Sequence, residues 1–257
     1  MTEKHHISGG QSASPSVFLE KVTFSYKGED LFQSLDFKVE GGLWTCLIGP
    51  SGVGKSTFLR LISGSIQEGY TGSIRFENRE TKKGLTAWMA QKDLLLPWLS
   101  VVDNVCLGAR LRGEVTGEIR EKAVALIQGV GLGDYIRSLP SELSGGMRQR
   151  VALLRTLMEN RPVILMDEPF SALDALTRLK LQDIAADLVK GATVLMVTHD
   201  PLEALRLGHR IHVMNGKPAT LSEPLIPPGN PPRKPGERTI ISLQADLLNL
   251  LEAEGGP

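Results

Sequence analysis

One glycine-rich segment constrains this chain more than any other: Gly49, Pro50, Ser51, Gly52, Val53, Gly54, Lys55, Ser56 and Thr57. It fits the pattern G-x-x-x-x-G-K-[ST], whose backbone amides surround phosphate oxygens. The apolar run 44–48 before it is typical of a strand, and residues 58–62 after it are typical of a helix. Glycine lets the backbone approach an anion closely, and the helix dipole attracts that anion. The sequence therefore predicts a phosphate or nucleotide site, with a glycine-rich turn that binds nothing as the alternative.

Within this segment two side chains have distinct expected roles. Lys55 would place a positive charge near the β- and γ-phosphates, and the Ser56 hydroxyl would be a magnesium ligand. The segment alone does not indicate which class of nucleotide-binding protein the chain belongs to.

Length and composition exclude several classes of protein. The chain has 257 residues and a formal net charge of zero, from 29 basic and 29 acidic side chains. This length suits one large α/β domain with room for a subdomain, and balanced charge disfavours nucleic acid as a partner. No apolar stretch approaches the ~20 residues of a membrane helix, so we expect any membrane role to act through a partner. The two cysteines, Cys46 and Cys106, are expected to be buried free thiols.

The pattern along the chain predicts an ordered succession of strands and helices. Strands are expected at 17–26, 35–39, 44–48, 72–77, 86–91, 162–166 and 193–198. The first ones would form an antiparallel layer, and the continuous apolar runs at 162–166 and 193–198 are typical of central parallel strands. Residues 98–145 are expected to form an inserted helical subdomain, and residues 1–16 a flexible leader. After a proline-rich linker, residues 240–252 have the spacing of an amphipathic helix that docks on its own domain or on a partner.

A strand that ends in two carboxylates supplies the second part of the predicted site. Residues 162–166 lead directly into Asp167 and Glu168, at the sheet edge where open α/β proteins bind ligands. Asp167 is expected to hold magnesium opposite Ser56, and Glu168 to act on the attacking water as general base or as its orienting group. An acidic pair after a strand can also be plain surface charge, and the upstream phosphate loop favours the metal interpretation.

A second anion-binding helix start is predicted at Ser144, Gly145 and Gly146. Ser144 has the properties of an N-cap for a helix that continues through Leu157, and the two glycines leave the first amides open to an anion. Since the phosphate loop already provides one cradle, this second site needs a different role.

The combination of these motifs resembles the nucleotide-binding subunit of an ATP-binding cassette (ABC) transporter. The segment Leu143-Ser144-Gly145-Gly146-Met147 is similar to the family's signature, with Met147 where many members have Gln. The resemblance implies an α/β fold with a P-loop NTPase (RecA-like) core, an antiparallel β layer and an inserted helical subdomain, over residues 17–216. It also implies ATP and Mg²⁺ as ligands and a homodimer in which Ser144, Gly145 and Gly146 of one subunit contact the ATP of the other.

Four further positions resemble functional positions of the family. Gln91 resembles the glutamine that contacts magnesium or water, and His199 the switch histidine at the γ-phosphate. Asp174, in the segment 171–174, resembles a residue at the crossing between subunits. Tyr26 resembles the aromatic that stacks on adenine, although a tyrosine near a strand end is ordinarily a packing residue.

The resemblance extends to partners and cargo. Residues 91–98, 103–105 and 170–178 resemble the branch that imports nitrate, sulfonates, taurine or thiamine-precursor pyrimidines. Such a subunit implies a separate transmembrane permease, a solute-binding protein acting indirectly, and a peripheral position on the cytoplasmic face of the inner membrane. Leu94, Leu95 and Leu96 are expected to contact the permease or to pack the subdomain, with some of the leucines in each role. A split exporter, a lipid-extraction ATPase, a soluble non-transport ABC ATPase and a non-enzymatic nucleotide sensor are the alternatives.

Overall fold

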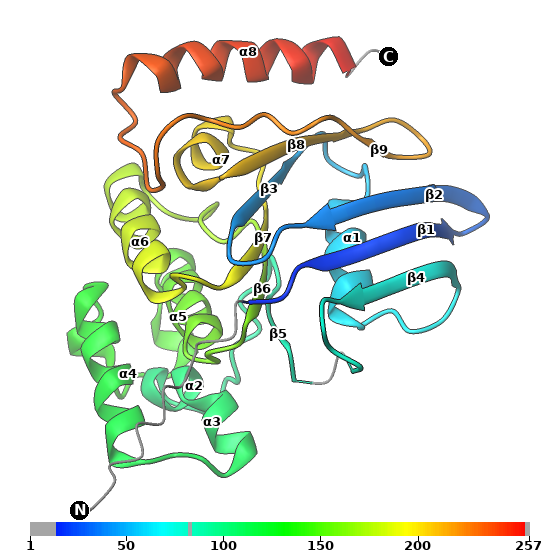
Figure 1. Cartoon of the computed structure of the whole chain (residues 1–257). Coiled ribbons are helices and arrows are strands. Elements are labelled where there is room, and N and C mark those ends of the chain that lie inside the picture. The colour runs from blue at the N-terminus through cyan, green and yellow to red at the C-terminus, as the bar shows by residue number, and fades with distance from the viewer. Residues whose placement is uncertain (1–13, 82–83, 255–257) are drawn as a thin grey trace, which may run out of the picture.

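The computed structural model describes residues 14–81 and 84–254, so most of the predicted leader, 1–16, lies outside the described residues. Figure 1 shows a central sheet with helices on one face, and on the other face the helix α1 beside a second, smaller sheet. The tail helix α8 lies across the far end of the molecule.

The central sheet places the ends of its strands at one edge, where the predicted site lies. Its strand order is β5-β6-β7-β3-β8-β9, and all neighbouring strands are parallel except the last pair. The strands are β3 (Trp44–Ile48), β5 (Thr86–Met89), β6 (Val163–Asp167), β7 (Thr193–Val197), β8 (Arg210–Asn215) and β9 (Thr220–Leu221).

Continuous apolar runs form the middle of this sheet because both of its faces are covered. All five residues of β3, β6 and β7 are buried. Successive side chains point to opposite faces, so Cys46 and Ile48 pack into the core beneath the helices, whereas Leu47 packs into the core beneath α1. The same division holds for Ile164 and Leu165 of β6.

The antiparallel layer has the order β2-β1-β4, with β1 (Val17–Tyr26), β2 (Glu29–Val39) and β4 (Tyr70–Phe76). Helix α1 (Lys55–Ser63) packs into the same core, where the Phe58 ring meets those of Phe32 and Phe37 edge-on. The sequence predicts that this strand begins at Leu35, but in the structure β2 begins six residues earlier, at Glu29. A hairpin turn with positive φ at Lys27 and Gly28 brings the exposed, charged start of β2 back alongside β1.

The remaining helices lie on the other face of the central sheet or beyond its edge (Figure 1). They are α2 (Val101–Val105), α3 (Leu107–Arg112), α4 (Gly117–Gly129), α5 (Gly145–Leu157), α6 (Ala175–Leu188) and α7 (Pro201–Leu207). Short polar side chains accept a backbone N–H at five of their N-termini and so satisfy groups that a helix leaves unpaired. The five caps are Ser100, Thr116, Ser144, Asp174 and Asp200.

The tail helix α8 (Arg238–Glu254) packs on α7, through buried Ile240 and Leu247. The preceding linker is held by Arg233, whose buried guanidinium donates to five backbone carbonyls, two of them at the C-terminal end of α7. Of the two predicted possibilities, docking on its own domain is therefore the one observed.

Within residues 14–81 and 84–254, no helix combines the length and the apolar character needed to span a bilayer.

Candidate functional site

The phosphate loop joins the end of β3 to the start of α1, as the sequence predicts. Gly54 has a φ of 115° and precedes the first helical residue, Lys55. A side chain at Gly49 has no room, because its Cβ would lie 2.1 Å from the carbonyl oxygen of Met214 on β8. Lys55 is buried, and its Nζ donates to the carbonyl oxygens of Gly49 (2.7 Å) and Pro50 (2.9 Å).

The burial of Lys55 and its place at the start of α1 favour a phosphate ligand. Burial lowers the pKa of the Lys55 ammonium, and the nearby carboxylates Glu168 and Asp167 oppose that shift. A buried cation at the N-terminus of a helix is a site where an anion is strongly stabilised.

Asp167 ends the buried strand β6 beside Ser56, the second residue of α1. Burial raises the pKa of the Asp167 carboxyl, and a hydrogen bond with Ser56 opposes that rise. The carboxylate and the hydroxyl are hard oxygen donors of the kind Mg²⁺ takes when it keeps several waters and binds substrate phosphates. Among the described residues no group of three or more His, Cys, Asp and Glu side chains could hold a metal. The oxygen donors of Ser56 and Asp167 fit a cation that also binds a phosphate ligand.

Glu168 lies at the meeting point of three loops. Its Oε2 accepts a hydrogen bond from Gln91 Nε2 (3.3 Å), and its Oε1 lies 3.3 Å from His199 Nδ1. Its φ is +49°, and its amide donates to the carbonyl oxygen of Val197 at the end of β7. This uncommon backbone conformation is one that proteins retain at functional positions.

A cleft of about 490 Å³ connects these groups, lined by Tyr26, Leu31, Ser51, Gly52, Gly54, Lys55, Ser56, Thr57, Arg60, Gln91, Asp167 and Glu168. Tyr26 is 61% exposed, so it is free to contact a ligand and is not a packing residue. It also borders a neighbouring hollow of about 650 Å³ that Lys217 and Pro218 help to line.

The structure does not bring every predicted site residue to this cleft. The lining lacks Gly49, Pro50 and Val53 of the phosphate loop, and also His199, Ser144, Gly145, Gly146 and Asp174. Of these, His199 adjoins the lining through its contact with Glu168. Ser144 caps α5 through the amide of Met147, and Asp174 caps α6 through the amide of Thr177. Gly146 packs closely, since a Cβ there would lie 3.0 Å from the carbonyl oxygen of Ala172, whereas a Cβ at Gly145 would make only an ordinary contact, 3.9 Å from Arg148 Nη2.

Three residues that contribute to the site were missed by the sequence analysis. Arg60 and Leu31 line the cleft without belonging to a predicted motif. Buried Gln149 donates to the carbonyl oxygens of Glu168 and Pro169, both at 3.3 Å, and so supports the loop behind Glu168. Its place two residues after Met147 in the segment 143–150 is the only sequence signal for it.

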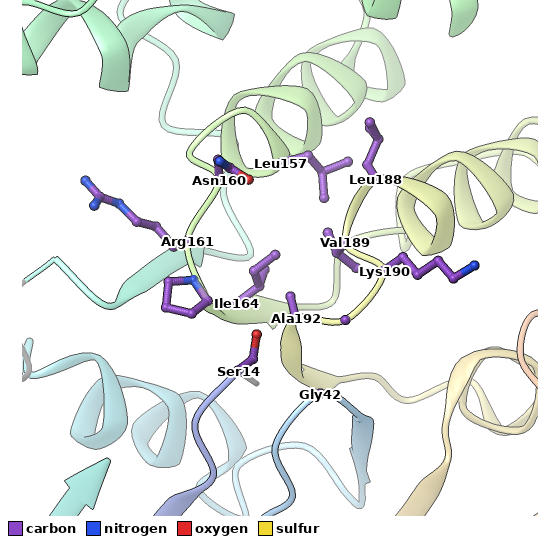
Figure 2. A pocket seen from close by; sticks show the side chains of 12 residues that line it. Ser14, Gly42, Leu157, Asn160, Arg161, Ile164, Leu188, Val189, Lys190 and Ala192 are labelled. Atoms are coloured by element: carbon purple, nitrogen blue, oxygen red, sulfur yellow. The ribbon is translucent and has the colours of Figure 1, made fainter. Parts of the chain in front are cut away.

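Another hollow, of about 570 Å³, lies at the opposite edge of the central sheet, near the C-terminal ends of α5 and α6 (Figure 2). Leu157, Ile164, Leu188 and Val189 give it an apolar wall, and the side chains of Arg161 and Lys190 extend away from it. It contains none of the predicted site residues, so the two carboxylates and the phosphate loop mark the candidate active site.

This fold and cleft define a phosphate-loop nucleotide-binding protein of the α/β class. The family profile described as "ABC transporter" matches residues 32–171, more than half of the chain. The chain belongs to the ABC transporter family as an ATP-binding subunit, and the predicted family and fold class are confirmed.

Relatives and solved structures agree with this assignment. A Haemophilus influenzae protein described as an ABC transporter ATP-binding protein is 45% identical over 243 residues, which cover 93% of this chain and 99% of the relative. The aliphatic sulfonates import ATP-binding protein SsuB 1 of Rhodococcus jostii is 39% identical, over 89% of this chain and 91% of its own. A dimeric ATP-binding cassette in a post-hydrolysis state with ADP and Pi is 30% identical, with a TM-score of 0.70 over 83% of this chain and 99% of that one.

Proposed function

We propose that this chain is the ATP-hydrolysing subunit of an importer for a small solute of the sulfonate, nitrate or taurine type. The observation that carries this proposal is the position of Glu168 beside the phosphate loop, between Gln91 and His199. The importer assignment is supported by the names of the relatives, which include several aliphatic sulfonates import ATP-binding proteins.

In this proposal the phosphate loop binds the triphosphate and Glu168 acts on water. The loop amides and Lys55 neutralise the phosphates, and Tyr26 stacks on the adenine. Glu168 accepts a proton from the attacking water or orients it, while Gln91 and His199 hold the Glu168 carboxylate in place. His199 then stabilises charge that develops on the γ-phosphate.

Mg²⁺ fits the oxygen donors of Ser56 and Asp167, with Gln91 as a third ligand of the cation or of its water. When bound, the ion would neutralise charge on the phosphate oxygens. The raised pKa of Asp167 shows that burial opposes its charged form, and a neighbouring cation would favour that form again.

The signature residues need a second subunit to reach an ATP. Since Ser144, Gly145 and Gly146 lie outside the cleft of their own chain, we propose that they bind the γ-phosphate held by a facing subunit, and that Asp174 lies at the crossing between subunits. Two ATP molecules would then join two subunits, and hydrolysis would release them, which is a ligand-driven population shift.

The exposed apolar side chains after Gln91 support a separate permease as partner. Leu94 is 58% exposed and Trp98 is 70% exposed, whereas Leu95 is buried in the helical core. Exposed apolar patches of this kind mark protein contacts. A solute-binding protein would select the cargo, and this subunit would lie peripherally on the cytoplasmic face of the inner membrane.

The test is ATP turnover by purified protein with and without Mg²⁺, in parallel for Glu168→Gln and Lys55→Ala. We expect the first variant to bind ATP and lose hydrolysis by about 10²-fold or more, as for removal of a general base. The second should bind ATP more weakly. Normal turnover by Glu168→Gln, or unchanged ATP affinity of Lys55→Ala, would reject these roles.

A further inference from the structure

Arg178, on the first turn of α6, contacts two loops that lie far apart in the sequence. Its Nη2 donates to the carbonyl oxygen of Leu173 (3.1 Å), next to the cap residue Asp174. Its Nη1 donates to Asp200 Oδ2 (3.0 Å), in the loop that carries His199. One guanidinium thus joins the segment 171–174 to the segment 198–200.

The loop of His199 is braced by a second set of contacts at the same place. Glu203 is buried, and its Oε1 lies 3.5 Å from Arg178 Nε. Its Oε2 accepts from the Thr198 hydroxyl (2.6 Å), which in turn accepts from the amide of Asp200 (3.0 Å). His199 lies between Thr198 and Asp200, so both of its neighbours in the chain are held.

We propose that Arg178 is a positioning residue that holds His199 against Glu168 and couples this contact to the position of the segment 171–174. Arg178 does not line the cleft and does not contact the Glu168 carboxylate. It acts through its contacts with Asp200 and Glu203. This inference rests on the proposed function, in which the segment 171–174 lies at the subunit crossing and His199 assists hydrolysis.

The geometry explains why an arginine serves this role. A planar guanidinium presents several donors in a fixed fork, so it can reach a carbonyl and two carboxyl groups at once. A lysine carries one flexible ammonium and cannot join all three partners. A displacement of the segment 171–174 would therefore shift the Arg178 fork, and with it the loop that presents His199 to Glu168.

The experiment is a double-mutant cycle on ATP hydrolysis by the full chain. We expect Arg178→Gln to lower kcat about tenfold with KM for ATP unchanged, because a misplaced group costs rate without loss of ground-state binding. In a His199→Ala background the same substitution should cost less than about twofold, because Arg178 acts through that side chain. Arg178→Lys should fall between Arg178→Gln and the unmodified protein.

Matched variants separate positioning from folding. Lys180→Gln removes an exposed charge two residues along α6 and should leave kcat unchanged. Asp200→Asn keeps the Oδ1 acceptor for the Leu202 amide but weakens the pair with Arg178, so it should lower kcat even if Arg178→Gln unfolds. An equal loss from Arg178→Gln in both backgrounds, a change in KM alone, or normal kcat in Asp200→Asn would overturn the proposal.

A readout without turnover distinguishes failure of this inference from failure of the proposed function. The NMR signals of the His199 imidazole should shift in Arg178→Gln and stay in place in Lys180→Gln. If the unmodified protein hydrolyses no ATP, the proposed function fails, and the imidazole signals still decide the role of Arg178. Unchanged signals in a folded Arg178→Gln variant would overturn that role even with normal hydrolysis in the unmodified protein.

Discussion

The buried carboxyl of Glu203 should make the stability of this protein fall as the pH rises. Burial raises the Glu203 pKa from 4.5 to about 7, and the charge of Asp200 adds to that rise, while the hydrogen bond from Thr198 and the charges of Arg178 and His199 oppose it. The folded state therefore holds a proton on Glu203 that the unfolded chain has already lost between these two pH values. Its stabilising contribution is complete below about pH 4.5 and disappears as the pH rises through about 7.

The size of the effect follows from the two pKa values. A difference of about 2.5 units corresponds to about 3 kcal/mol at most, of which about 2.5 kcal/mol should be lost between pH 5 and pH 8. Glu203→Gln keeps the shape of the side chain and an oxygen that can accept from Thr198, and it does not titrate. The free energy of unfolding of Glu203→Gln should therefore lack the pH-dependent contribution of the Glu203 carboxyl.

Urea denaturation of both proteins at several values between pH 5 and pH 8 measures the difference directly. The stability of the unmodified protein should decline relative to Glu203→Gln by about 2.5 kcal/mol across this range. Asp187→Asn, which removes an exposed carboxyl from α6, is the matched control and should show no such relative change. A stability difference between the unmodified protein and Glu203→Gln that stays constant with pH would refute the reasoning.

Two further predictions use pairs of neighbouring positions. On α8, Leu247 is fully buried and Leu248 is 43% exposed. Leu247→Ala should therefore lower the free energy of unfolding by about 2–5 kcal/mol, and Leu248→Ala by less than about 1 kcal/mol. Equal thermal shifts for the two variants would show that α8 does not dock through Leu247. Gly49→Ala would bring a Cβ into the backbone of β8. At Gly52 a Cβ would meet no atom within 4 Å, so Gly52→Ala is opposed only by the positive φ of 82°. Without nucleotide, we expect the free energy of unfolding to fall by about 3 kcal/mol in Gly49→Ala and by about 1 kcal/mol in Gly52→Ala. A larger fall in the melting temperature of Gly52→Ala than of Gly49→Ala would contradict the described loop.

Local signals in the sequence were enough for the framework of the fold. The apolar runs of β6 and β7 predicted parallel strands covered on both faces, and the structure has them in that place. The run that forms β3 was predicted as the strand before the phosphate loop, and it too is a parallel strand of this sheet. Ser144 was predicted as a helix cap from its residue type and context, and its hydroxyl accepts from the amide of Met147. The spacing of the tail leucines predicted an amphipathic helix, but it left open whether that helix docks on its own domain or on a partner.

Contacts between distant segments were beyond sequence reasoning. Gln91 and His199 meet the two oxygens of Glu168, although 77 residues separate the first pair and 31 the second. Motif order suggested roles for these side chains but could not show that they share one carboxylate. The run Leu94-Leu95-Leu96 shows the same limit, since only the fold turns Leu95 inward and leaves Leu94 exposed.

The sequence assigns Arg178 no role beyond its place in the segment 170–178, and it assigns Glu203 no role. In the sequence they are an ordinary glutamate and arginine, and only the fold brings α6 and α7 close enough for the pairs Arg178–Glu203 and Arg206–Asp183. The same holds for Arg233, whose five carbonyl partners come from the linker and from the end of α7. The roles of such polar residues depend on which segments the fold brings together, and the periodicity of the sequence does not indicate them.

The central claim is that the helix start at Ser144–Gly146 of one subunit binds the ATP held by Lys55 of another. The most direct measurement is the mass in solution of Glu168→Gln with ATP and Mg²⁺, by light scattering, beside the double variant Glu168→Gln/Ser144→Arg. We predict a species of twice the 28.0 kDa chain mass for the first protein and a monomer for the second, because the larger side chain would block the anion-binding helix start. A strictly monomeric Glu168→Gln at high concentration with saturating ATP, or a dimer that forms equally well with Ser144→Arg, would contradict the claim.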